Sequence, residues 1–151
     1  MSGREITKGR DYPPRPIVGV GAVIFRGAEV LLVKRGHAPS AGLWTIPGGA
    51  VRLGERVAAA LRREVAEEVG LKVRVGPLVA VLDRVFRDAA GRIQYHYVLL
   101  DYLCRVVSGE LAAASDAAQA RFVPLRELKG LRLTRGTRAV IEQARRVDVS
   151  Q

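Results

Sequence analysis

A helix rich in glutamate and arginine, bounded by glycines, constrains the fold more than any other feature of the chain. It lies within residues 48–71, "GGAVRLGERVAAALRREVAEEVGL". The pattern predicts a helix over residues 55–69, ended by Gly70 as a C-terminal cap. At 100° per residue, one stripe of this helix is apolar and can pack on a sheet; it consists of Ala58, Leu61, Val65 and Val69.

The same helix carries an acidic strip. Glu64, Glu67 and Glu68 fall within about 100° of one another around the helix axis. Like charges one turn apart cost a few tenths of a kcal/mol per pair, so a bound divalent cation would offset a real penalty. Mg²⁺ prefers carboxylate and carbonyl oxygens and is usually shared with substrate phosphates. We expect the strip at the rim of a cleft beside the sheet; the alternative is a solvated acidic face.

The remaining pattern predicts a mixed α/β fold. Apolar, β-branched runs predict strands, and a second amphipathic stretch predicts a helix. The expected strands cover residues 17–25, 30–34, 43–46, 73–86, 94–107 and 121–125, and the second helix runs from Thr134 to about Arg146. Because the strands are apolar runs more than alternating ones, we expect helices to cover both faces of the sheet.

Size and composition indicate one domain preceded by an arm. The chain has 151 residues, within the usual ~100–200 residues of one domain. Residues 1–16 are basic and contain three prolines, which predicts an irregular arm before a single domain over 17–151. No apolar run approaches the ~20 residues of a membrane span, and no secretory signal is present, so we expect a cytoplasmic protein without a membrane partner. The single cysteine, Cys104, lies in an apolar strand and is expected in the core.

The net charge of +10 leaves three interpretations open. Basic residues can attract a small polyanion such as a nucleotide, or they can bind nucleic acid. They can also reflect an arginine-rich composition without functional meaning. Because the basic residues are scattered, nucleic acid is the least favoured of the three.

The spacing around the acidic helix resembles the Nudix box, G-x5-E-x7-R-E-U-x-E-E-x-G-U with U aliphatic. Gly49 and Glu55 supply the first two fixed positions, and residues 63–71, "REVAEEVGL", supply the rest. Every fixed position matches across 23 consecutive residues. The resemblance implies an α/β/α sandwich with two main helices, and a Mg²⁺-dependent hydrolase, with Mn²⁺ as a substitute, that cleaves a nucleoside diphosphate linked to another group.

The resemblance also implies roles for individual residues. Glu67 and Glu68 would be metal ligands, and Glu64 would be a further ligand or the catalytic base. The carbonyl of Gly48 would add an oxygen donor, and Arg63 would hold Glu64 through a charge-assisted hydrogen bond. Glu55 would brace the loop or bind metal through water. A base on a later loop is the alternative, with Asp116 the first candidate and Glu110 the second.

The substrate is less constrained by the sequence. Residues 94–125 resemble short members assigned to ADP-ribose, although the proline expected near Arg87 in one such group is missing. We therefore expect ADP-ribose to be cleaved to AMP and ribose 5-phosphate. A nucleoside triphosphate is the rival substrate, and a non-catalytic domain that binds a nucleotide or RNA is the rival class. Candidate substrate-binding residues are Arg35, Trp44, Arg84, Phe86 and His96. The alternative for Trp44 is a place in the core, and the alternative for His96 is a structural or solvated role. A homodimer formed through the arm is also expected.

Overall fold

The computed structural model describes residues 10–112 and 117–149. Ten elements follow one another along the chain. The strands are β1 (Ile17–Arg26), β2 (Glu29–Arg35), β3 (Trp44–Thr45), β4 (Gly48–Ala50), β5 (Leu71–Arg87), β6 (Ile93–Gly109) and β7 (Ala117–Pro124). The helices are α2 (Val57–Val69), the 3₁₀ helix η1 (Leu125–Gly130) and α3 (Thr137–Val149).

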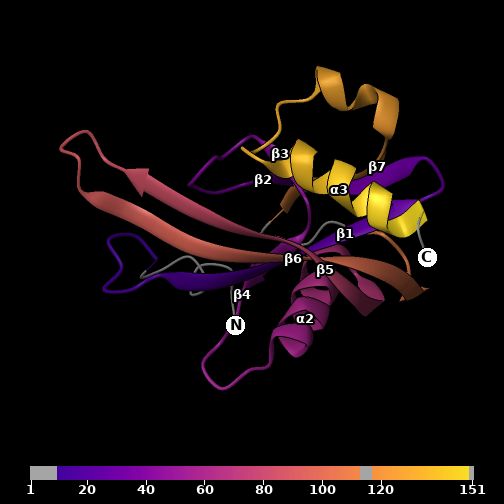
Figure 1. Ribbon diagram of the computed structural model, residues 1–151, viewed down its shortest axis with the longest axis horizontal. Coiled ribbons are helices and arrows are strands. Elements are labelled where there is room, and N and C mark those ends of the chain that lie inside the picture. The colour runs from indigo at the N-terminus through magenta and orange to yellow at the C-terminus, as the bar shows by residue number, and fades with distance from the viewer. Residues whose placement is uncertain (1–9, 113–116, 150–151) are drawn as a thin grey trace.

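The strands form a mixed seven-stranded sheet in the order β3-β2-β1-β6-β5, with β4 paired to β1 and β7 paired to β2. The central pair, β1 and β6, is parallel, and the other pairs are antiparallel. Figure 1 shows α2 on one side of the sheet and α3 on the other. The prediction of a mixed sheet between two main helices is confirmed.

Two apolar clusters hold the helices against the sheet. The apolar stripe of α2 packs on one face through Leu61, Val65 and Val69, against β1 residues such as Ala22 and Ile24. The α3 side is held by a second cluster that includes Val23, Leu32, Trp44, Val140 and Ile141. Alternate residues of β1 therefore feed opposite cores, as the period of two in a strand requires.

Several elements differ from the sequence prediction, including α3, which begins at Thr137 and not at Thr134. Strand β4 was not predicted, because Gly-Gly-Ala lacks strand-forming residues and is extended only by its pairing with β1. Strand β7 begins at Ala117, four residues earlier than expected, and η1 follows it at Leu125. Helix α2 begins at Val57, since the backbone N–H of Glu55 bonds the carbonyl of Arg52 and closes a turn instead.

Cys104 is buried as predicted, and burial raises the pKa of its thiol to about 12. No helix of the described residues is long and apolar enough to cross a bilayer. The division into an arm and a domain stays a prediction.

The packing of α2 gives a first prediction. Leu61→Ala should lower the free energy of unfolding by about 2–5 kcal/mol, because the side chain is fully buried between helix and sheet. Its neighbour Arg62 is exposed, so Arg62→Ala should change stability by no more than about 0.5 kcal/mol. Urea unfolding of both variants, followed by circular dichroism, checks this. Equal losses in the two variants would contradict the packing of α2 described above.

Candidate active site

One arginine ties helix α2 to the turn that precedes it. Arg63 donates from Nε and Nη2 to both carboxylate oxygens of Glu55, at 2.7 and 2.8 Å. Its Nη1 donates to Glu64 at 2.7 Å, and its Nη2 also donates to the carbonyl oxygen of Ala50 at 3.0 Å. Forked bonds of this kind fix direction as well as distance. The turn over residues 50–55 is therefore fastened to the helix.

The pKa values of the two carboxyl groups bonded to Arg63 shift in opposite directions. Hydrogen bonds from Arg63 lower the pKa of Glu55 to about 2, so Glu55 is a stable anion at neutral pH. Burial raises the pKa of Glu64, although the bond from Arg63 opposes the shift. The structure thus holds two carboxylates on the same arginine in different electrostatic environments.

The three carboxylates of the acidic strip differ in exposure. Glu64 is only 7% exposed, so it is not at the open rim where we expected it; its carboxyl lies against the backbone of Gly49, where a Cβ would come within 2.2 Å of the carboxyl carbon. Glu68 accepts a hydrogen bond from the backbone N–H of Gly48 at 3.0 Å. The Glu67 side chain is 46% exposed and accepts from Arg63 at 3.3 Å.

The oxygen donors do not converge on one point. Within residues 10–112 and 117–149, no group of three or more His, Cys, Asp or Glu side chains has the geometry of a metal site. Instead Arg63 and Gly48 each hold part of the strip, and Arg52 stands 3.9 Å from Glu67. The donor set nevertheless consists of hard oxygens, which suits Mg²⁺. Glu67 is exposed enough to turn toward an ion by a change of rotamer.

The acidic strip opens into a cleft of about 580 Å³. This volume lies within the roughly 300–1,000 Å³ range of small-molecule sites. All three carboxylates line it, together with the carboxyl of Asp101 and the side chains of Arg35 and Arg84. One cavity therefore joins an anionic end to basic and polar walls.

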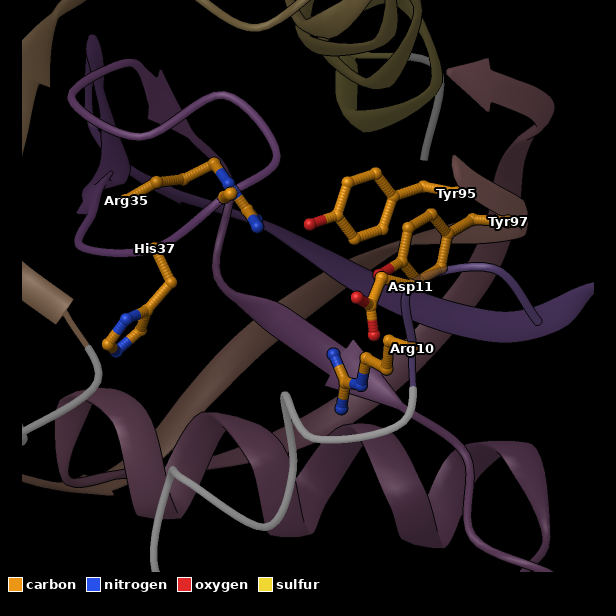
Figure 2. A pocket seen from close by; sticks show the side chains of 7 residues that line it. Arg10, Asp11, Arg35, His37, Tyr95 and Tyr97 are labelled. Carbon is orange, nitrogen blue, oxygen red and sulfur yellow. The ribbon is translucent and has the colours of Figure 1, made fainter. Parts of the chain in front are cut away.

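A basic and aromatic recess of about 260 Å³ adjoins this cleft. Figure 2 shows Arg35 and Tyr95 pointing toward one another, with Arg10 below them. Tyr95 and Tyr97 stack with ring centroids 6.4 Å apart, and burial lowers the pKa of Arg35. Arginine and tyrosine side chains of this kind suit phosphate oxygens and ribose hydroxyls.

The segment that brings Arg10 to the recess is fastened to the β5–β6 hairpin. The backbone N–H of Tyr12 donates to the carbonyl of Gln94 at 2.7 Å, and its hydroxyl donates to Asp88 at 2.8 Å. Arg92 lies over the Tyr12 ring, 5.1 Å from its centroid. Part of the predicted arm thus contributes to the walls of the site. Residues 1–9 lie outside the described residues.

The structure separates the predicted substrate-binding residues into two groups. Arg35, Arg84 and Phe86 line the cleft. Trp44 does not: it is 8% exposed, belongs to the core under α3, and has the guanidinium of Arg121 over its ring at 5.0 Å. His96 does not line the cleft either, because it alternates with Tyr95 and Tyr97 along β6.

The other predicted positions lie in β4, in the turn before α2 or outside the described residues. Gly48 lines the cleft, whereas Glu55 braces the turn through Arg63 and does not line it. Asp116 lies outside the described residues, so its predicted role as base stays a prediction. Four further wall residues were not predicted from the sequence: Arg10, Tyr95, Tyr97 and Asp101. A period of two along residues 95–101 was the available signal for the last three.

Asp101 is the most unusual of these missed residues. It is 5% exposed, and burial raises the pKa of its carboxyl to about 6 from an ordinary 3.8, with the charge of Arg84 opposing the shift. A raised carboxyl pKa means that the folded state binds more protons between about pH 4 and 6 than the unfolded state does. This group therefore lowers stability as pH rises through that window.

The shift gives a second prediction. Asp101→Asn removes the buried charge, so it should raise the free energy of unfolding at pH 7.5 by up to about 3 kcal/mol relative to the native sequence. At pH 4 the native carboxyl is protonated, and the gain should largely disappear. Urea unfolding of both proteins at the two pH values checks this. A gain of the same size at both pH values would show that the carboxyl does not titrate in this way.

Comparison with known proteins places the chain in a family. The NUDIX domain model matches residues 15–144. The ADP-ribose pyrophosphatase of Methanocaldococcus jannaschii is 37% identical over 128 residues, which are 85% of this chain and 73% of that protein. The putative 8-oxo-dGTP diphosphatase 2 of Mycobacterium tuberculosis is 49% identical over 103 residues, 68% and 69% of the two chains. The crystal structure of a MutT NUDIX hydrolase from Burkholderia pseudomallei superposes with a TM-score of 0.75 at 37% identity, over 85% of this chain and 98% of that one. These matches confirm the prediction of a hydrolase that acts on pyrophosphate bonds: the chain belongs to the Nudix family.

Proposed function

We propose that the protein hydrolyses ADP-ribose to AMP and ribose 5-phosphate with the help of Mg²⁺. One observation carries the proposal: a single cleft joins the three carboxylates of α2 to a basic and aromatic recess. In ADP-ribose a diphosphate joins two sugars. The carboxylates can hold the metal ion that binds the diphosphate, and the recess can contact phosphate oxygens and ribose hydroxyls. The similarity to a protein named ADP-ribose pyrophosphatase over 85% of this chain supports the same substrate.

Four groups would hold the metal. Glu64, Glu67 and Glu68 offer carboxylate oxygens, and the carbonyl of Gly48 offers a fourth donor beside them. Bound Mg²⁺ would neutralise charge on the diphosphate and lower the pKa of a coordinated water molecule. For Glu67 this requires release from Arg63 and Arg52. The contact with Arg52 joins two exposed side chains and is therefore weak. Arg63 would keep Glu55 and Glu64 as partners when Glu67 leaves it.

The protein's own groups would orient the reaction. Water attacks one phosphorus, the bridging P–O bond breaks, and the bridging oxygen leaves with the other phosphate. Arg63 keeps Glu64 at the cleft. In the alternative in which Glu64 is the catalytic base and not a metal ligand, its raised pKa suits a residue that accepts the proton of water. Arg35 and Arg10 can contact anionic or hydroxyl oxygens of the substrate from the recess.

A nucleoside triphosphate is the second candidate substrate. The specific observation in its favour is the 49% identity to a protein named as a putative 8-oxo-dGTP diphosphatase, the highest identity among the relatives described above. That similarity covers 68% of this chain, compared with 85% for the ADP-ribose pyrophosphatase. A homodimer stays a prediction for either substrate.

The role of the acidic strip gives a third prediction. Glu68→Gln should lower kcat about a hundredfold or more, the scale observed when one electrostatic stabiliser of a transition state is lost. The amide oxygen can still accept from the N–H of Gly48, so the fold should persist. The matched control is Glu142→Gln, on an exposed position of α3.

Two measurements check it: steady-state kinetics at saturating Mg²⁺, and thermal unfolding with and without the ion. The native protein should melt higher with Mg²⁺, and the gain should shrink in Glu68→Gln but not in Glu142→Gln. Turnover by Glu68→Gln near that of the native protein would remove this residue from the metal site.

The substrate assignment gives a fourth prediction. ADP-ribose should have a kcat/KM at least about tenfold above that of dGTP or 8-oxo-dGTP, equivalent to about 1.4 kcal/mol of transition-state preference. Chromatography should identify AMP and ribose 5-phosphate as products. A tenfold preference in the opposite direction would replace ADP-ribose with a nucleoside triphosphate and leave the hydrolase assignment intact.

A further inference from the structure

The carboxyl of Asp101 lies in a pit on the face of the sheet that the cleft uses. Its neighbour on β1 is Gly21, and its neighbour on β5 is Ala80, so two of the smallest residues flank it. A Cβ at position 21 would come within 2.3 Å of Asp101 Oδ1 and 2.8 Å of the Ile46 side chain. The glycine therefore leaves the space that the carboxyl occupies.

Among the described residues, none donates a hydrogen bond to this carboxyl, whose oxygens keep some contact with solvent at the cleft. Neither a hydrogen bond nor an ion pair within 4 Å reaches it from residues 10–112 or 117–149. Arg84 lines the same cleft, but its guanidinium donates to the backbone carbonyls of Asp83 and Arg135. A buried charged group without a partner is costly, and the other buried carboxylate among the described residues, Glu64, is paired with Arg63. The carboxyl of Asp101 is thus open toward the cleft, where a ligand can pair with it.

The pit has a fixed place relative to the acidic strip. Gly21 pairs with Asp101 on one side and with Gly48 on the other, and the N–H of Gly48 donates to Glu68. Two strand spacings, roughly 10 Å, therefore separate the backbones of Asp101 and Gly48. A nucleotide with its phosphate at the acidic strip can extend its base to the pit.

We propose that Asp101 is a specificity-determining residue whose carboxyl group pairs with the amino edge of adenine. The proposal rests on the function proposed above, because ADP-ribose brings an adenine nucleotide to the acidic strip. One carboxyl oxygen would accept from the N6 amino group, and the protonated oxygen would donate to N1. The base would complete the hydrogen bonding that the protein leaves unmade.

The surroundings favour adenine over guanine. Guanine presents two donors on its N1–N2 edge, which suits an ionised carboxylate, whereas adenine presents a donor and an acceptor, which suits the neutral acid. Burial already favours the neutral form of Asp101, and a base placed over it would remove more water. The positive charge of Arg84, on β5, opposes this preference for the neutral acid. The neighbours Gly21 on β1 and Ile46, just before β4, carry no charge. Arg135 contacts Arg84 through its backbone carbonyl.

Binding of AMP and GMP without metal tests the assignment, by calorimetry at pH 5.5 and pH 7.5. The native protein should bind AMP more tightly than GMP. The phosphate of AMP also titrates at about pH 6 and affects native and variant proteins alike, so the readout is the ratio of the two Kd values. Asp101→Asn presents a donor and an acceptor at every pH, so the ratio of the native Kd to the Asp101→Asn Kd should rise from pH 5.5 to 7.5 as the native acid ionises. Asp101→Leu should weaken AMP binding about tenfold or more.

Asp148→Asn is the matched control, because Asp148 is a partly buried carboxylate on α3 that pairs with Arg105 at 3.0 Å and does not line the cleft. It should bind AMP as the native protein does. The proposal is overturned if Asp101→Leu, shown to be folded by circular dichroism, binds AMP within twofold of the native protein. Tighter native binding of GMP, or the same pH profile in Asp101→Asn, would overturn it too. Failure to cleave ADP-ribose would refute the proposed function alone, because nucleotide binding is measured without turnover.

Discussion

The hydrogen bonds of Arg63 are the interaction on which the site depends. The guanidinium joins Glu55 and Ala50, in the turn before α2, to Glu64 within the helix. Without it, the turn and the helix would be linked mainly through the backbone between them, and the buried carboxyl of Glu64 would lose its cationic partner. The position of Glu64 beside Gly49 follows from this link, as does the edge of the cleft.

The glycines of β1 and β4 are the second requirement. Gly48 and Gly49 let the chain pass close to Val20 and to the carboxyl of Glu64, where side chains would collide. Gly21 likewise leaves space for the carboxyl of Asp101. The cleft is therefore shaped by glycines without side chains as much as by the side chains that line it. Strand β1 lies between the two parts, because Gly21 pairs with Gly48, next to the acidic strip, and with Asp101 in the pit.

Local patterns made the helix and its chemistry predictable. The apolar stripe of α2, the cap at Gly70 and the spacing of the glutamates all repeat within a few residues, so the sequence alone located them. The pit was not predictable, because it needs Asp101 to lie beside Gly21 through a parallel pairing of β1 with β6, eighty residues apart. Strand β4 was missed for the same reason. The sequence left Trp44 between substrate binding and the core because aromatic residues serve both, and the packing of α3 places it in the core.

The burial of the single cysteine has a practical consequence for observing this molecule. The thiol of Cys104 has a pKa near 12 and lies within the core, so almost none of it is the reactive thiolate at neutral pH. A cysteine introduced on the surface would then be labelled selectively without removing the natural one. Fluorophores placed in this way on the β5–β6 hairpin and beside Tyr12 would report whether the segment that carries Arg10 stays on the hairpin while a ligand enters and leaves.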